Sequence, residues 1–307
     1  MDICTVLYFV GALLVLFFVW YKFADADFSL LLLVKFGRGV ESLQGKVIWI
    51  TGASSGIGEH LAYTLAKVGV DLALSGTNVK NLTSVQEKCL EIGKKKGTRV
   101  LLVPFNVRDF SIHEQQLSKV TDFFGKVDVL VNNAGLCRNG MFESDSSQEF
   151  ERDLFDVNVF GPVSLARLVV RHFKQRQHRG QVVVTSSMAG RTGIINASAY
   201  CASKHAVHGY FQTLALEGSL SVYGPDVTIA CPGPVETRMW AATPKKFQLE
   251  AMSTSRCAQL IAIAMANKVG ETWIIANPLL LLMYTPRVLR RWAYKLLPRN
   301  KARKNEE

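Results

Sequence analysis

Apolar and polar positions alternate in blocks along residues 46–277. Seven short apolar runs predict β-strands, and the longer stretches between them repeat apolar residues every three to four positions, as amphipathic helices do. The clearest helical stretches are residues 59–69 and 206–220. Nearly continuous apolar strands separated by helices indicate a parallel sheet covered on both faces. We therefore predict a single α/β domain, a doubly wound Rossmann-like parallel sheet with strands KVIWI (46–50), DLALS (71–75), RVLLVPF (99–105), VDVLVNN (127–133), QVVVTSS (181–187), VTIACPG (227–233) and ETWIIAN (271–277).

A separate apolar run, residues 4–21, carries no charge and has about the length that spans a bilayer as a helix. Asp2 precedes it and bulky residues occupy the place of a cleavage site, which favours a retained anchor over a cleaved signal peptide. Lys22, Lys35 and Arg38 follow the run, so the positive-inside rule predicts a cytosolic catalytic portion. We expect a single-pass protein of the endoplasmic reticulum membrane.

The predicted organisation has four parts: an anchor over 1–22, a juxtamembrane linker over 23–44, the domain over 45–278 and a tail over 279–307. Within the linker, FSLLLLVKF (28–36) is too short to span a membrane, and it fits an interfacial helix or a segment entering the core. The tail mixes apolar and basic residues, which fits a helix lying on a membrane surface or an ordinary helix closing the substrate cleft.

The distribution of charge and the spacing of the cysteines limit which binding partners and metal or disulfide sites the chain can have. Residues 287–307 hold eight basic residues against two acidic ones, and so supply +6 of the net charge of +11. Such a tail suggests an anionic partner, and no recognition motif favours nucleic acid over phospholipid. The six cysteines show no C-x-x-C pair, so we expect neither a metal site nor a disulfide framework. Cys201 is better explained as core packing than as a nucleophile.

The stretch TGASSGIG (51–58) follows the first predicted strand and opens the first helix. Its glycine spacing suits a tight turn whose backbone approaches a pyrophosphate at a helix N-terminus. The expected contacts come from Gly52, Ser54, Ser55, Gly56, Ile57 and Gly58. After the second strand, Gly76 and Thr77 stand where a carboxylate would select NAD, so the missing carboxylate favours NADP(H) over NAD(H).

Four motifs occur in order along the chain: TGASSGIG, NNAG (132–135), YCASK (200–204) and CPGP (231–234). Together they resemble the short-chain dehydrogenase/reductase family over roughly residues 45–278. The apolar N-terminus with YCASKHA and CPGPV is most similar to the membrane-bound member 7 branch. The resemblance implies a nicotinamide cofactor, a small substrate, a carbonyl/alcohol reaction, and a homodimer or homotetramer.

Carried over residue by residue, the resemblance makes Tyr200 the general acid/base and Lys204 its helper. It makes Ser187 a catalytic and substrate-binding hydroxyl, and Asn158 a member of the proton relay. Further cofactor contacts implied by the family are Thr77, Asn106, Val107, Asn133, Ala134, Gly135, Tyr200, Lys204, Pro232, Gly233 and Thr237. Asn106 stands where the family usually has an aspartate, so its contact lacks the charge.

The residues also explain the chemistry directly. A phenol can donate a proton to a developing oxyanion, a nearby hydroxyl can stabilise that oxyanion, and an ammonium one turn away should lower the phenol pKa. We therefore expect a membrane-anchored oxidoreductase of lipophilic carbonyl/alcohol pairs of the steroid or retinoid class. The alternative is a catalytically silent scaffold of the same fold that only binds the cofactor.

Overall fold

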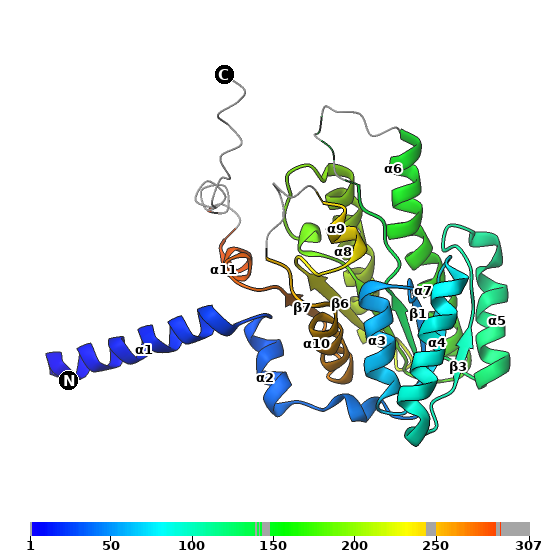
Figure 1. The fold of residues 1–307 in the computed structure, drawn as a ribbon, viewed down its shortest axis with the longest axis horizontal. Helices are drawn as coiled ribbons and strands as arrows, with labels where there is room; N and C mark the ends of the chain where they lie inside the picture. Colours follow the sequence, from blue (N-terminus) through cyan, green and yellow to red (C-terminus); the bar gives the residue numbers. More distant parts are fainter. Residues whose placement is uncertain are drawn as a thin grey trace.

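The computed structural model describes residues 2–138, 140, 142, 148–243, 250–286 and 289, and it forms one α/β body with an extended N-terminal helix (Figure 1). Seven parallel strands make a single sheet in the order β3-β2-β1-β4-β5-β6-β7. All seven predicted strands are confirmed, at β1 (Val47–Thr51), β2 (Asp71–Ser75), β3 (Val100–Leu102), β4 (Val129–Asn132), β5 (Gln181–Thr185), β6 (Asp226–Pro232) and β7 (Glu271–Ile274).

Helices cover both faces of the sheet, as the sequence predicts. One face packs against α3 (Gly56–Ala66), α4 (Val79–Gly93) and α10 (Thr254–Ala266). The other packs against α5 (His113–Phe124), α7 (Gly161–Gln175) and α8 (Ser198–Ser219). Strands buried from both sides need apolar residues at nearly every position, which explains their continuous apolar runs.

Short elements connect these layers. The 3-10 turns are η1 (Val40–Leu43), η2 (Lys94–Lys96), η3 (Phe110–Ile112) and η5 (Met188–Gly190). α6 (Gln148–Phe155) continues through a π-helical turn, η4 (Asp156–Phe160), into α7. α9 (Arg238–Ala241) follows β6, and α11 (Leu279–Tyr284) follows β7.

The N-terminal helix α1 (Ile3–Phe23) projects away from the body in Figure 1. Its apolar part, Cys4–Phe23, has a mean hydropathy of 2.2 and is not buried against the rest of the protein. At 1.5 Å per residue its 21 residues extend about 31 Å, close to the hydrocarbon thickness of a bilayer. The helix is therefore compatible with a single-pass anchor.

The segment after α1, expected as a linker, packs onto the body. Asp27 is buried and accepts hydrogen bonds from Leu30 N, Thr272 Oγ1 and Trp273 N. α2 (Phe28–Phe36) then contacts α10, with Leu30 fully buried in the core beneath it. Residues 28–36 were expected to form either an interfacial helix or a segment entering the core. The face of α2 that carries Leu30 enters the core.

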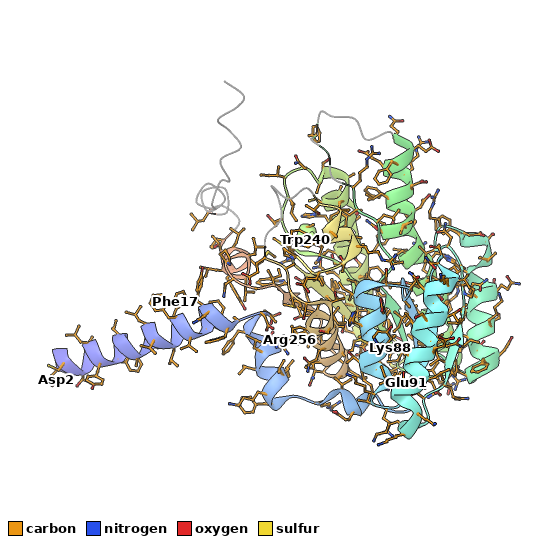
Figure 2. The ribbon with its side chains drawn as sticks, in the orientation of Figure 1. Asp2, Phe17, Lys88, Glu91, Trp240 and Arg256 are labelled. Atoms are coloured by element: carbon orange, nitrogen blue, oxygen red, sulfur yellow. The ribbon has the colours of Figure 1, made fainter. Side chains whose placement is uncertain are left out.

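A salt bridge and an aromatic contact complete the junction. Arg256 of α10, labelled in Figure 2, pairs with both carboxylate oxygens of Asp25 at 2.7 and 3.2 Å. The Trp20 and Tyr284 rings lie 6.2 Å apart, which joins the end of α1 to α11. Of the predicted tail, residues 279–286 and 289 are described; the rest, which holds the basic residues of the predicted surface helix, lies outside the described residues.

Candidate active site

One cavity of about 580 Å³ opens at the carboxyl ends of the strands, where the sheet order reverses between β1 and β4. Open parallel sheets bind ligands at this place. Most of the predicted site residues line the cavity: Gly52, Ser54, Ser55, Gly56, Ile57, Thr77, Asn106, Val107, Asn133, Ala134, Gly135, Ser187, Tyr200, Lys204, Pro232, Gly233 and Thr237. The fold thus brings residues from the carboxyl ends of six strands, together with Tyr200 and Lys204 of α8, to one place.

The glycine turn has the geometry that a pyrophosphate requires. Gly52 and Gly56 have φ of +66° and +62°, in the left-handed region that favours glycine. A Cβ on Gly52 would lie 2.7 Å from the Ala134 Cα. Ser55 is the N-cap of α3 but makes no side-chain cap, and Ser55, Gly56 and Ile57 all face the cavity. The N-terminal end of α3 therefore presents polar backbone to an anion, and these residues fit a dinucleotide.

Gly58 is an exception among the predicted cofactor contacts, because it does not line the cavity. It is buried, and a Cβ there would lie 2.4 Å from the Gly52 carbonyl oxygen and 2.6 Å from Asn133 Nδ2. Glycine at this position allows α3 to approach the turn, so its contribution is close packing.

Asn133 braces the glycine turn against the central strands. Its Nδ2 donates to the carbonyl oxygens of Thr51 and Gly52, and its Oδ1 accepts from Thr185 Oγ1 at 3.2 Å. The Thr51 hydroxyl accepts from the backbone N–H groups of Asn133 and Ala134. Thr51 and Thr185 are supporting residues that the sequence analysis did not identify, although each is the last residue of its strand.

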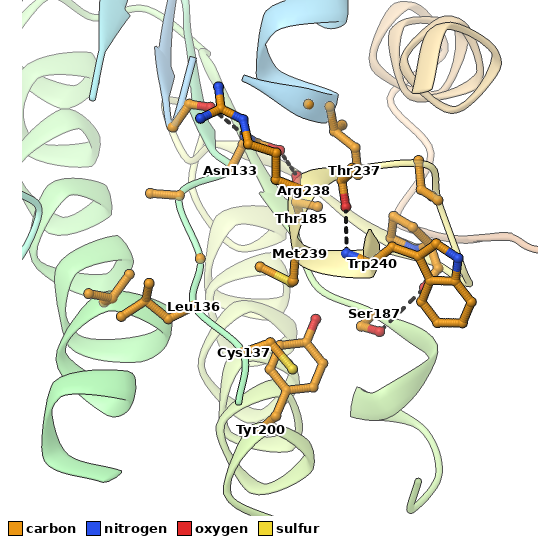
Figure 3. Close-up of a pocket in the computed structure, with 18 of the residues that line it drawn as sticks. Asn133, Leu136, Cys137, Thr185, Ser187, Tyr200, Thr237, Arg238, Met239 and Trp240 are labelled. Atoms are coloured by element: carbon orange, nitrogen blue, oxygen red, sulfur yellow. Dashed lines mark hydrogen bonds between the residues drawn. The ribbon is translucent and has the colours of Figure 1, made fainter. Parts of the chain in front are cut away.

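Ser187 and Tyr200 lie close together in the cavity (Figure 3), and Lys204, which also lines it, has its ammonium near the Tyr200 ring. Tyr200 and Lys204 come from α8, and Ser187 is the N-cap of η5, two residues after the end of β5. Ser187 Oγ donates to the Pro232 carbonyl at 3.3 Å. Lys204 is 5% exposed, and its ammonium donates to the Thr185 carbonyl at 2.9 Å.

Burial dominates the acid–base properties of this group. It raises the pKa of Tyr200, and a hydrogen bond with Ser187 only partly offsets the effect. It lowers the pKa of Lys204 to about 8. We expected Lys204 to lower the phenol pKa; burial of the phenol raises it instead, because a phenolate is poorly solvated there.

Asn158 lies behind the cavity and does not line it. It is buried in η4, where its Oδ1 accepts from Leu136 N at 2.7 Å. Its Nδ2 donates to the Leu136 carbonyl and to Ser203 Oγ. The side chain therefore fastens the loop after β4 to α8, and the proton-relay role stays a prediction.

At the other end of the cavity the second strand finishes without a carboxylate. Gly76 packs close to Ser54, whose Oγ would be 3.2 Å from a Cβ at position 76. Thr77 and Asn106 are exposed at the cavity rim. Arg108 also lines the rim, and its guanidinium pairs with Asp153.

A short helix, α9, lines the cavity after β6, and here the structure adds residues that the sequence analysis missed. Thr237 caps α9 by accepting from Trp240 N at 3.2 Å. The next three side chains, Arg238, Met239 and Trp240, all line the cavity (Figure 3). The Arg238 guanidinium makes no ion pair within the described part of the chain. Their signal in the sequence was only their position directly after Thr237.

Apolar residues and a thiol complete the reacting end. Ile194 and Ile195 of the loop before α8 line the cavity and are 39% and 77% exposed. Cys137 faces the Tyr200 ring in Figure 3, and burial raises the pKa of its thiol to about 11. Cys201 is buried and its Sγ accepts from Ile194 N, which agrees with a packing role.

Comparisons with known proteins find similarity to dehydrogenases and reductases. The short chain dehydrogenase family model matches residues 46–248. The chain is 39% identical over 283 residues to the human dehydrogenase/reductase SDR family member 7, covering 88% of this chain and 82% of that protein. It is 34% identical over 239 residues to 11-beta-hydroxysteroid dehydrogenase-like 2 of Arabidopsis thaliana, covering 76% and 74%.

Solved structures match at the level of the domain. Levodione reductase superposes with a TM-score of 0.69 at 26% identity, covering 76% of this chain and 97% of that one. An alcohol dehydrogenase from the archaeon Thermococcus sibiricus, complexed with 5-hydroxy-NADP, has a TM-score of 0.67 at 26% identity, with coverage of 76% and 97%.

Proposed function

The chain belongs to the short-chain dehydrogenase/reductase family, and we propose that it is a membrane-anchored enzyme using NADP(H) to interconvert lipophilic carbonyls and alcohols. As a family member it is an NAD(P)-dependent dehydrogenase or reductase of small substrates. The observation that carries the proposal is that Ser187, Tyr200 and Lys204 share one cavity with the glycine turn.

The protein residues divide the chemistry among themselves. A nicotinamide cofactor, when bound, supplies or accepts the hydride. Tyr200 gives its phenolic proton to the substrate oxygen in the reducing direction and takes it back in the oxidising one. Ser187 donates a hydrogen bond to the same oxygen, where negative charge develops. The Lys204 ammonium stabilises charge beside Tyr200 and can hold hydroxyls of the nicotinamide ribose.

The preference for NADP(H) is argued from the rim of the cavity. A carboxylate at the end of β2 would accept from a ribose 2′-hydroxyl and repel a 2′-phosphate, and Gly76 and Thr77 stand there instead. Arg238 adds positive charge to the cavity wall, whereas the charge of Arg108 is already paired with Asp153. The Thermococcus sibiricus neighbour, whose structure holds 5-hydroxy-NADP, supports the same choice.

A lipophilic substrate suits the mouth of the cavity. Ile194, Ile195, Met239 and Trp240 give the reacting end an apolar wall, and α1 would bring that wall to a membrane in which such molecules dissolve. The 11-beta-hydroxysteroid name of the plant relative supports the steroid class, and retinoids remain within the proposal. We further propose a single-pass endoplasmic reticulum protein with a cytosolic catalytic domain, assembled as a homodimer or homotetramer.

A substrate panel tests this proposal. The detergent-solubilised full chain is incubated with NADPH or NADH and with steroid, retinoid and quinone carbonyls. We expect steroid or retinoid reduction with a higher kcat/KM for NADPH than for NADH. Tight NADPH binding without turnover of any carbonyl would instead support a scaffold that only binds the cofactor.

A further inference from the structure

A partly buried polar cluster lies behind the catalytic serine, outside the cavity. Its centre is the carboxylate of Glu271, the first residue of β7. Arg191 Nε lies 3.3 Å from Oε1, and His208 Nδ1 lies 3.5 Å from Oε2. Trp273 Nε1 donates to Oε1 at 3.0 Å, and Gln212 Nε2 donates to Oε2 at 3.3 Å. Four side chains from three segments therefore converge on one carboxylate.

The carboxylate is held in its charged form. Burial by itself would raise the pKa of Glu271, but the nearby His208 imidazole, the hydrogen bond from Trp273 and the charge of Arg191 lower it to about 2. His208 is only 5% exposed. Several side chains share this one partly buried carboxylate, so moving it away would leave all of them without their common partner. The Glu271 carboxylate can therefore hold the side chains around it in fixed positions.

Arg191 connects the cluster to the catalytic turn. It is the C-cap of η5, and its N–H donates to the Met188 carbonyl at 3.0 Å. Within the turn, Gly190 N donates to the Ser187 carbonyl at 2.9 Å, and Ala189 N donates to Ser187 Oγ at 3.1 Å. Residues 187–191 thus form one hydrogen-bonded unit with the catalytic hydroxyl at its start and the ion pair at its end.

His208 holds the same unit from below. A Cβ on Gly190 would lie 2.6 Å from His208 Cδ2, so the turn rests directly on the imidazole. His208 Nε2 is 3.6 Å from Cys231 Sγ, and the next residue, Pro232, accepts the hydrogen bond from Ser187 Oγ. The imidazole therefore touches both backbone segments that fix the serine hydroxyl.

We propose that Glu271 is a positioning residue of the active site. By holding Arg191 and His208 it fixes the turn 187–191 against α8, so that the Ser187 hydroxyl faces the Tyr200 phenol. Neither Glu271 nor Arg191 nor His208 lines the cavity, so their effect on catalysis passes through the turn. The inference rests on the proposed function and adds to it a set of residues that orient the oxyanion-stabilising hydroxyl.

The chain offers a matched control in Asp226, the first residue of β6. Like Glu271 it is a partly buried acid at a strand start, with its side chain 17% exposed against 23%, and it pairs with Arg179 and Lys268. Asp226 does not line the cavity. Loss of its charge should disturb the sheet at the start of β6 to a similar degree without reaching the turn.

The test compares Glu271→Gln with Asp226→Asn in the detergent-solubilised full chain. Misplacement of a catalytic group by about 1 Å can cost about 100-fold, so we expect Glu271→Gln to lower kcat by about 10- to 100-fold while the Kd for NADPH stays near that of the unaltered protein. Asp226→Asn should leave kcat near that of the unaltered protein. Equal loss of kcat in the two variants, or full activity in Glu271→Gln, would overturn the proposal.

A second readout does not depend on turnover. Hydrogen exchange of the peptide covering residues 187–192 should accelerate in Glu271→Gln and in Arg191→Gln, but not in Asp226→Asn. If Glu271→Gln does not fold, Arg191→Gln, whose side chain is 28% exposed, tests the same link. Unchanged exchange in either folded variant would overturn the positioning role. Absence of carbonyl turnover in the unaltered protein would count against the proposed function and leaves the exchange test intact.

Discussion

Lys204 lies one helical turn after Tyr200 on α8, and its ammonium nitrogen is 5.6 Å from the centre of the Tyr200 ring. Both groups are desolvated, and burial moves their pKa values in opposite directions: upward for the phenol and downward for the ammonium. At neutral pH the phenol therefore keeps its proton and the ammonium keeps its charge, which is the pair of states that carbonyl reduction needs.

The pH dependence of carbonyl reduction should follow Lys204. Its pKa of about 8 means that the cation is present below that pH and is lost above it, whereas the raised pKa of Tyr200 keeps the phenol protonated. We expect kcat/KM for NADPH, which reports the free enzyme, to be level below pH 7 and to fall above about pH 8. Lys204→Arg should remove this decline, because a guanidinium stays charged throughout the range. An alkaline limb that is unaffected by Lys204→Arg would contradict this assignment.

Arg238 should contribute to cofactor affinity. Its guanidinium reaches into the cavity from α9, directly after Thr237, whose methyl carbon would lie 3.2 Å from a Cβ on Gly56. Charge-assisted hydrogen bonds are worth about 1.5–3 kcal/mol, so Arg238→Gln should weaken NADPH binding by about 10-fold or more. Fluorescence titration with NADPH and with ADP-ribose measures the effect.

Both titrations should weaken in parallel if the guanidinium binds cofactor phosphate. Arg108→Gln is the control, because Arg108 already pairs with Asp153 at the rim. Unchanged Kd values together with a raised KM for the carbonyl substrate would show that Arg238 serves the substrate instead.

Asp27 should matter to stability far more than Asp25. Removing the Asp27 carboxylate leaves buried donors on Thr272 and Trp273 without an acceptor, at a cost of about 1–3 kcal/mol. Asp25 makes only a partly exposed ion pair with Arg256, worth about 0–1 kcal/mol. Urea unfolding of Asp27→Ala and Asp25→Ala measures the difference, and similar midpoints for the two variants would contradict it.

The sequence predicts the sheet well, and it identifies the motifs that meet in the cavity, because both depend on local patterns. Apolar runs define each strand, and the glycine turn and the Tyr200–Lys204 spacing are visible within a few residues. The boundaries of β3 differ from the prediction: residues 99–105 were expected, and the strand covers Val100–Leu102. This strand lies at the edge of the sheet, and Pro104 has no N–H to extend a ladder.

The contacts that the sequence does not predict are those that depend on the order of the strands. Arg191 and Glu271 are 80 positions apart, and they meet only because β6 and β7 pair beside β5. Asp27 is read as part of a linker, since nothing near it in the chain indicates that Trp273 lies across from it. To predict contacts between side chains far apart in the chain, one must know the order and register of the strands, which a single sequence does not supply.

The central claim is that Tyr200 transfers the proton to and from the substrate oxygen. Stopped-flow oxidation of bound NADPH by a turned-over carbonyl, compared between the unaltered protein and Tyr200→Phe, tests it most directly. General acid catalysis contributes about 10²- to 10⁴-fold, so we predict that Tyr200→Phe binds NADPH with nearly unchanged affinity and slows the step by that factor. Oxidation of NADPH by Tyr200→Phe at the unaltered rate would contradict the account.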